Sequence, residues 1–242
     1  MNTKNKISIV CIIIVIAICC YFYFKDYGHN NLFKTPTLFY GDKVVYVGSE
    51  NLKSSEEGVQ YSLSVWIRPN NLYLNTDWGG DANIPKTILN NNGSPNIVYL
   101  VKENTVNIQM AYYGIDNTID LYNIEMPNFE SQKWTNLIIT VDNKLVNVYK
   151  NGIIYTSKEL FNPNVKNYKL MNIGEKYNNF NGYIGRIDYY NYVLSSDKTN
   201  NIYEKYKSYH PSQLMSYEQY EFLKKDAEDT KINTDKFKNF FV

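Results

Sequence analysis

Residues 134–155 read WTNLIITVDNKLVNVYKNGIIY, and their turns and strand-forming runs indicate the fold class. The pair Asn151-Gly152 tolerates the positive φ angles that both central positions of a type I′ turn require. Residues 142–144, Asp-Asn-Lys, have similar turn chemistry in a slightly longer turn. The flanking runs are rich in Val, Ile, Tyr and Thr, which favour strands. The stretch therefore predicts three consecutive antiparallel strands, and such a meander favours an antiparallel β-sandwich.

Further strand candidates lie on both sides of the meander. They cover residues 38–40, 43–47, 61–68, 86–89, 97–101, 105–113, 119–124, 170–173 and 183–192. Many short strands without helices between them favour an all-β fold, a two-sheet antiparallel jelly-roll sandwich. In residues 61–68, Tyr, Leu, Val and Ile alternate with Ser, Ser, Trp and Arg, so one face is continuously apolar. We expect this strand to be central, ended by Pro69.

Composition divides the chain into four parts. Residues 1–25 form an N-terminal transmembrane anchor, 26–36 a polar linker, 37–209 the β domain and 210–242 a helical tail. Ser195 and Ser196 offer an N-cap for a short helix running through Tyr209. From residue 212 onward, charged residues mixed with Leu, Tyr and Phe predict a second, exposed helix. The apolar, basic end of the tail either docks on the domain or binds a partner.

The anchor prediction rests on residues 7–24, an uncharged apolar run about as long as a membrane-crossing helix. A cleaved signal peptide and a buried core helix are the two alternatives. The bulky aromatic residues that end the run argue against a signal peptide. Lys4 and Lys6 precede the run and only Lys25 follows it directly, which favours a cytoplasmic N-terminus. The sequence therefore predicts a single-pass, signal-anchored membrane protein whose C-terminal domain is external or lumenal, on a cell or a virion membrane.

Charge and cysteine content exclude several classes of site and partner. The 25 Lys and Arg residues nearly balance the 24 Asp and Glu residues, and the net charge is +1 at pH 7. Without a basic stripe, nucleic acid is not expected as a partner. All three cysteines, Cys11, Cys19 and Cys20, lie in the apolar run, so the β domain folds without disulfides. His29 and His210 are expected to be isolated surface histidines, which leaves no material for a zinc site or a nucleophilic triad.

The loop at residues 75–83, NTDWGGDAN, is the candidate ligand site. Asp77 and Asp81 offer oxygen ligands to Ca²⁺, the one cofactor that the sequence suggests. Trp78 offers a flat face for a sugar ring, and Asn83 adds a polar contact. An ordinary solvent loop whose Trp packs on the sheet is the alternative interpretation.

Three ordered pieces of the chain resemble the laminin G-like, concanavalin A-like lectin/glucanase superfamily. They are residues 61–69, residues 134–152 and residues 182–195. The first resembles the family's strand with a Trp near its end, the second its Y-x-N-G hairpin, and the third its closing strand that leads through Leu-Ser into a short helix. The resemblance covers residues 37–209 and implies a two-sheet jelly roll of about a dozen strands with a history of binding glycans or proteins. The matched residues are scaffold, not catalytic groups.

The sequence thus predicts a membrane-anchored, non-enzymatic, lectin-like domain that binds glycan or a surface protein. One alternative is a structural or assembly module of a membrane or virion complex, with Phe240 and Phe241 as contacts. The other is a glycan-cleaving enzyme, which needs two carboxylates about 5 to 10 Å apart. No Glu-x-Asp-x-x-Glu pattern is present, and Pro127 interrupts any strand through Glu125 and Glu130.

Overall fold

The computed structural model describes thirteen strands and the helix α2 within a defined part of the chain. The described residues are 12–17, 28–34, 36–39, 42–52, 55, 58–70, 83–116, 118–165 and 170–207. Residues 12–17 are helical, but no helix in these ranges is long and apolar enough to cross a membrane. Most of the expected anchor and the whole of the expected tail, residues 210–242, lie outside the described residues.

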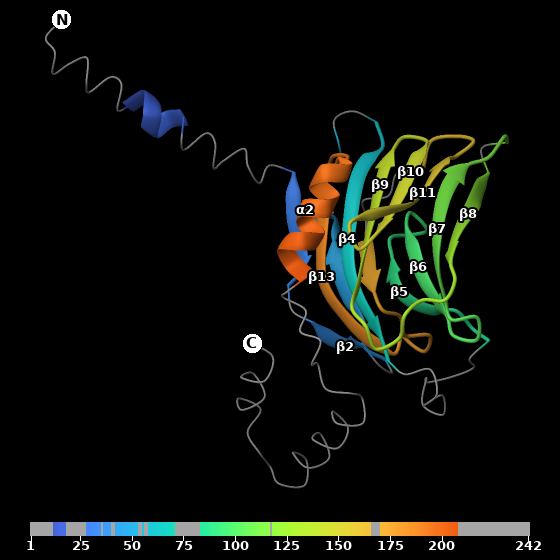
Figure 1. The fold of residues 1–242 in the computed structure, drawn as a ribbon. Coiled ribbons are helices and arrows are strands. Elements are labelled where there is room, and N and C mark those ends of the chain that lie inside the picture. Colours follow the sequence, from blue (N-terminus) through green and yellow to red (C-terminus); the bar gives the residue numbers. More distant parts are fainter. Residues whose placement is uncertain are drawn as a thin grey trace, which may run out of the picture.

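The strands form two antiparallel sheets packed face to face, as in a jelly-roll sandwich (Figure 1). The seven-stranded sheet has the order β1(His29–Phe33), β13(Gly182–Tyr190), β4(Gln60–Pro69), β9(Thr135–Asp142), β10(Leu145–Lys150) and β11(Ile153–Glu159), with β2(Thr37–Phe39) also paired to β13. The six-stranded sheet has the order β3(Val45–Gly48), β12(Leu170–Ile173), β5(Lys86–Asn90), β6(Asn96–Leu100), β7(Thr105–Tyr113) and β8(Ile119–Met126). A short 3-10 helix, η1(Ser49–Asn51), follows β3.

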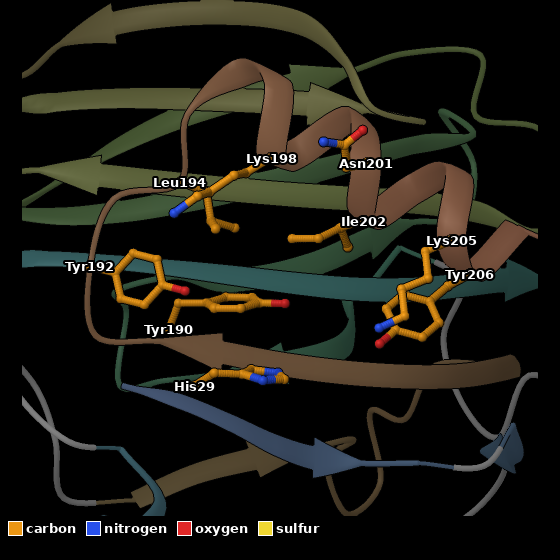
Figure 2. A pocket seen from close by; sticks show the side chains of 9 residues that line it. All are labelled: His29, Tyr190, Tyr192, Leu194, Lys198, Asn201, Ile202, Lys205 and Tyr206. Carbon is orange, nitrogen blue, oxygen red and sulfur yellow. The ribbon is translucent and has the colours of Figure 1, made fainter. Parts of the chain in front are cut away.

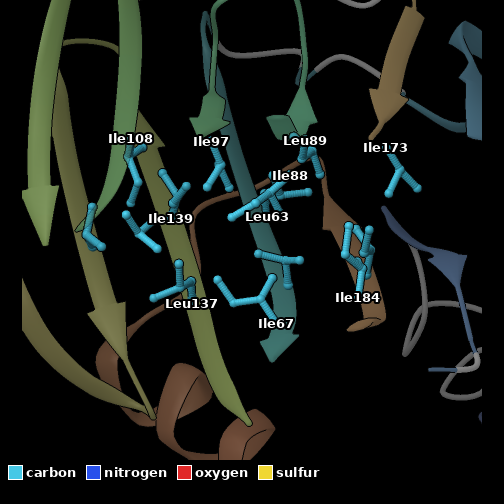
Figure 3. Close-up of a cluster of buried hydrophobic side chains, with 14 of the residues drawn as sticks. Leu63, Ile67, Ile88, Leu89, Ile97, Ile108, Leu137, Ile139, Ile173 and Ile184 are labelled. Atoms are coloured by element: carbon cyan, nitrogen blue, oxygen red, sulfur yellow. The ribbon is translucent and has the colours of Figure 1, made fainter. Parts of the chain in front are cut away.

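The main core lies between the two sheets. Strand β4 is central, as expected, because it pairs with β13 on one side and β9 on the other. Its apolar face, which includes Leu63 and Ile67, meets Ile97 and Ile108 of the opposite sheet (Figure 3). These side chains are fully buried. Apolar residues alternate along β4 because every second side chain points into the core between the sheets.

The meander is confirmed as β9, β10 and β11. Asn151 and Gly152 have φ angles of 52° and 78°, and Lys150 pairs with Ile153, so this is a two-residue turn. The first turn is shorter than expected. Asp142 is already paired, and only residues 143 and 144 form the loop, because Asn143 adopts a left-handed φ of 54°.

Strand β1 corrects the expected linker at residues 26–36. His29–Phe33 pairs with β13 and closes one edge of the seven-stranded sheet. The polar side chains that suggested a linker have a protein partner, because His29 and Asn31 both contact the buried Asp188. No local pattern reveals this, since that partner lies far along the chain.

Helix α2(Ser196–Tyr206) packs on the outer face of the seven-stranded sheet (Figure 1). The Ser195 side chain caps it, as expected, by accepting a hydrogen bond from the Lys198 amide, and the helix ends three residues before the expected Tyr209. Under the helix lies a second apolar cluster, separate from the main core. Its buried members are Trp66, Trp134 and Tyr183, and Tyr203 and Tyr206 of α2 pack against them.

Candidate functional site

The predicted calcium and sugar loop lies almost entirely outside the described residues. Asp77, Trp78 and Asp81 lie outside the described residues. Asn83 is described and exposed, and its side-chain oxygen accepts a hydrogen bond from the ammonium of Lys102. Among the described residues, no group of three His, Cys, Asp or Glu side chains is placed to hold a metal ion.

A pocket of about 250 Å³ lies where α2 crosses β13 and β1, and we call it the helix pocket (Figure 2). It is lined by His29, Tyr190, Tyr192, Leu194, Lys198, Asn201, Ile202, Lys205 and Tyr206. Four of these residues, at positions 198, 201, 202 and 205, follow the i, i+3, i+4, i+7 spacing of one helix face. The sheet and the segment after β13 supply the aromatic wall.

Aromatic rings form one wall of the helix pocket. The His29 ring stacks on Tyr190 with centroids 4.5 Å apart and planes 10° apart, and Tyr192 meets Tyr190 edge-on at 5.7 Å. Burial, then the negative charge of Asp188, raises the pKa of Tyr190, so its phenol keeps its proton at neutral pH. Tyr190 is itself buried in these contacts, so the half-buried rings of His29 and Tyr192 form the exposed part of the wall, which suits contact with a sugar ring.

Cationic side chains lie over the aromatic rings of the pocket. The Lys198 ammonium is 5.3 Å from the Tyr192 ring centroid, and the Lys205 ammonium is 4.9 Å from that of Tyr206. The Arg186 guanidinium, which is not part of the lining, stacks at 4.0 Å on the same Tyr206 ring. Lys198 and Lys205 carry exposed hydrogen-bond donors and positive charge, which suits a carboxylate or sulfate group on a ligand.

Asp188 is a buried residue that holds His29, one of the lining residues, in place. Its buried carboxylate lies 2.9 Å from His29 Nε2, accepts a hydrogen bond from Asn31 Nδ2 at 2.7 Å, and pairs with Arg186 through Nε and, at 2.8 Å, Nη2. Burial alone would raise the pKa of Asp188, but the hydrogen bonds from His29, Arg186 and Asn31 outweigh it and lower this pKa. His29 is therefore not the isolated surface residue that the sequence predicts, because Asp188 holds its ring in the stack.

A second polar surface crosses the outer face of the six-stranded sheet. Five cross-strand neighbours form it, and we call it the amide row: Asn172, Asn90, Asn96, Gln109 and Asn123. Asn96 Nδ2 donates to Gln109 Oε1 at 2.7 Å, and Gln109 Nε2 donates to Asn123 Oδ1 at 3.2 Å. Within the described residues, Oδ1 of Asn96 and Asn172 has no hydrogen-bond partner.

The amide row has hydrogen-bonding capacity but lies on an open sheet face, whereas the helix pocket is concave. Of the carboxylates on the described strands, alternation places Glu125 on this outer face without a second one beside it. Hydrolysis of a glycosidic bond requires a pair. Among the described strands, this outer face therefore holds no such pair.

Comparison with known families identifies the scaffold. A family model described as the concanavalin A-like lectin/glucanases superfamily matches residues 40–199. The chain belongs to this superfamily. The search of curated proteins found no match. The matched residues, 40–199, exclude β1 and most of α2. His29 and Lys205, which line the helix pocket, therefore lie outside the match.

Solved structures share the fold of this superfamily member at low sequence identity. The receptor binding domain of a botulinum neurotoxin C/D mosaic serotype aligns with a TM-score of 0.53 and 18% identity, covering 71% of this chain and 42% of that one. The botulinum neurotoxin serotype D binding domain gives 0.53 and 15%, with 73% and 46% covered. The binding domain of botulinum neurotoxin DC in complex with SialylT gives 0.50 and 16%, with 73% and 46% covered. The chain thus spans less than half the length of these structures.

The helix pocket is not apparent from the sequence, for a physical reason. Its walls come from three segments, β1, β13 and α2, that are brought together only by the fold. Two local signals were present. These were the Tyr-rich residues 189–192 and the helical spacing of residues 198–205, which together place aromatic and basic side chains near one another.

Proposed function

We propose that this domain is a non-enzymatic, glycan-binding module and that the helix pocket receives an acidic sugar. One observation carries the proposal: the pocket combines an aromatic wall with ammonium groups of Lys198 and Lys205 above the rings. A sugar ring stacks its C–H face on such a wall and directs its hydroxyls to donors at the rim. A carboxylate on that sugar would gain charge-assisted hydrogen bonds from the two lysines.

The size of the pocket favours a terminal sugar over a long chain. Its volume of about 250 Å³ is just below the roughly 300 to 1,000 Å³ of sites for drug-sized ligands. Proteins of this fold support the ligand class by analogy, since one neighbour is complexed with SialylT and cell entry of botulinum neurotoxin type C depends on two ganglioside molecules. Fold alone does not set a function, so the site carries the argument.

We further propose that residues 7–24 anchor the chain in a membrane and present the domain on a cell or virion surface. The uncharged length of this run supports the anchor. The loop containing Asp77, Trp78 and Asp81 stays a proposed accessory contact that depends on Ca²⁺.

Glycan-array binding by the full chain in lipid nanodiscs tests the main proposal. We expect acidic glycans to bind and their uncharged counterparts to bind at least tenfold more weakly. The double variant Lys198→Gln/Lys205→Gln should lose this preference, whereas Lys158→Gln, an exposed lysine on β11, should keep it. An equal loss in both variants would mean non-specific charge attraction and would contradict the proposal.

Two further arms locate the ligand. Asn96→Ala with Gln109→Ala tests the amide row, and loss of binding there with the lysine double variant unaffected would move the site to the six-stranded sheet. A chelator, with Asp81→Ala beside it, tests the calcium loop. Absence of any glycan binding by folded protein would favour the structural or assembly module.

A further inference from the structure

Exposed apolar side chains gather at the tip of the β7–β8 hairpin. They belong to Tyr113, Ile115, Ile119, Leu121 and Phe161, and we call this group the apolar tip. The five residues are 42%, 83%, 62%, 53% and 65% exposed, respectively. Tyr113 pairs with Ile119 across the hairpin, and Asn162, next to Phe161, donates a hydrogen bond of 2.7 Å to the Tyr113 carbonyl. The strand pairing places Tyr113 and Ile119 side by side, and the Asn162 bond brings the segment that carries Phe161 next to the hairpin. Exposed apolar groups gathered in this way mark an interaction site.

The apolar tip lies at the end of the sandwich where β1 begins. His29 pairs with Tyr190, which pairs with Ser62 near the start of β4, and Gln60 at that start pairs with Asp142 at the end of β9. The end of β11 reaches the same level, because Glu159 pairs with Leu145 just after the β9–β10 turn, and Phe161 follows. Figure 1 shows the start of β1 and the β7–β8 tip toward the upper end of the sandwich, on opposite sides of it.

The sequence upstream of β1 identifies the occupant. The apolar run ends at Phe24, and five residue steps lead from there to His29. A fully extended chain covers at most about 18 Å in five steps. If the run crosses a bilayer, the start of β1 must therefore lie within that distance of the lipid surface, and the apolar tip lies at the same end of the sandwich.

We propose that the apolar tip inserts into the outer layer of the same membrane and holds the domain against it. Insertion of about 5 to 10 Å, as for other interfacial elements, would bury Ile115 and Ile119 among acyl chains. Exposed Asp116 and Asp120 flank these residues, so the tip fits zwitterionic lipid better than anionic lipid. The inference depends on the proposed anchor but not on glycan binding.

Depth measurement by electron paramagnetic resonance tests the insertion. The full chain, with its three cysteines replaced by Ala, is placed in phosphatidylcholine nanodiscs and labelled with nitroxide at Ile115→Cys. Ile153→Cys is the matched control, since Ile153 is 69% exposed and lies at the opposite end of β11. We expect the label at 115 to be at least threefold more accessible to oxygen than to a water-soluble nickel chelate, relative to the label at 153.

Other outcomes each contradict the inference in a recognisable way. Equal aqueous accessibility at 115 and 153 would overturn it, and spin–spin broadening at 115 would replace lipid with a second copy of the chain. A third sample labelled only at Cys19 reports on the anchor. Lipid exposure at 19 with aqueous exposure at 115 rejects the tip alone, and aqueous exposure at both rejects the anchor as well.

Discussion

Asp188 shows how one buried carboxylate serves both stability and the site. It is ionised beneath the helix pocket and holds His29, Asn31 and Arg186 in place. A lowered pKa in the folded state means that its contribution to stability is complete above the unfolded value of 3.8 and is lost as pH falls through the folded value. Protonation of Asp188 in acid should therefore weaken the contacts that hold His29 in the helix pocket.

Asp188→Asn should lower the free energy of unfolding by about 3 kcal/mol at pH 7, because it removes one partner of a buried charge pair. The difference from the parent should shrink as pH falls below 4, where the parent carboxylate also takes up a proton. Urea unfolding at pH 7 and pH 3 measures both values, with exposed Asp116→Asn as the control. A difference that does not change with pH would show that the carboxylate acts through packing and not through charge.

Gly152 is a second residue whose substitution should lower the free energy of unfolding. Its φ is +78°, and an added Cβ would lie 3.0 Å from the Tyr203 Cβ and 3.1 Å from the Asn200 Cα of helix α2. Gly152→Ala should cost about 2 to 3 kcal/mol through combined backbone strain and collision. Gly93→Ala is the matched control, since Gly93 has a φ of +84° but its nearest neighbour is at 3.4 Å. Thermal unfolding compares them, and equal losses would contradict a close approach to α2.

At the scale of the element, α2 is fastened to the sheet through Ser62. The Ser62 hydroxyl donates to the Tyr192 carbonyl at 2.8 Å and accepts from the Leu194 amide at 2.9 Å. This tether sets the path of the segment that leads from β13 into the helix. It therefore sets one wall of the helix pocket.

Ser62→Ala should cost about 1 to 3 kcal/mol, because two backbone groups lose their partner. It should also weaken glycan binding, because Tyr192 and Leu194 shift. Ser64→Ala is the control, since Ser64 is equally buried on the same strand but accepts from Asn136 away from the pocket. Isothermal titration calorimetry and urea unfolding separate the two effects. Unchanged affinity in Ser62→Ala would show that the tether does not position the pocket.

The elements that the sequence predicted correctly are those with a strong local pattern. Turn residues indicate the meander, alternation indicates the central strand at residues 61–68, and a cap indicates the helix after Ser195. Strand β1 has none of these signals, because its stability comes from pairing with β13 and from Asp188. The helix pocket was missed for the same reason, since its residues are far apart in the sequence.

At the scale of the whole molecule, the sandwich and its helix have separate apolar clusters. Trp66 and Trp134 lie in the cluster under α2, where the Trp66 ring stacks on Tyr203 at 5.8 Å. Thr199 is the only buried residue of α2. The helix therefore has little burial of its own, and we expect it to separate from the sandwich before the main core unfolds.

Denaturant titration of a Trp78→Phe variant checks this order. Tryptophan emission should shift to longer wavelength at lower urea than the loss of the far-ultraviolet β signal, because Tyr203 and Tyr206 of α2 pack on the cluster that holds the two remaining tryptophans. Trp134→Ala, which removes a large side chain from this cluster, should widen the gap and cost about 3 to 5 kcal/mol. Coincident transitions would show that helix and sandwich unfold as one unit.

The pairing of β1 with β13 also has a consequence for biosynthesis. His29 and its partner Asp188 are 159 residues apart, so the first strand to leave the ribosome pairs with the last. At translation rates of about 5 to 20 residues per second, β1 waits roughly 8 to 30 s for its partner. During that interval the polar strand stays open next to the apolar run, and a nascent chain stalled before residue 182 could not complete the sheet. The order of synthesis thus makes closure of this domain a late event, because the sheet edge at β1 stays unpaired until β13 has been made.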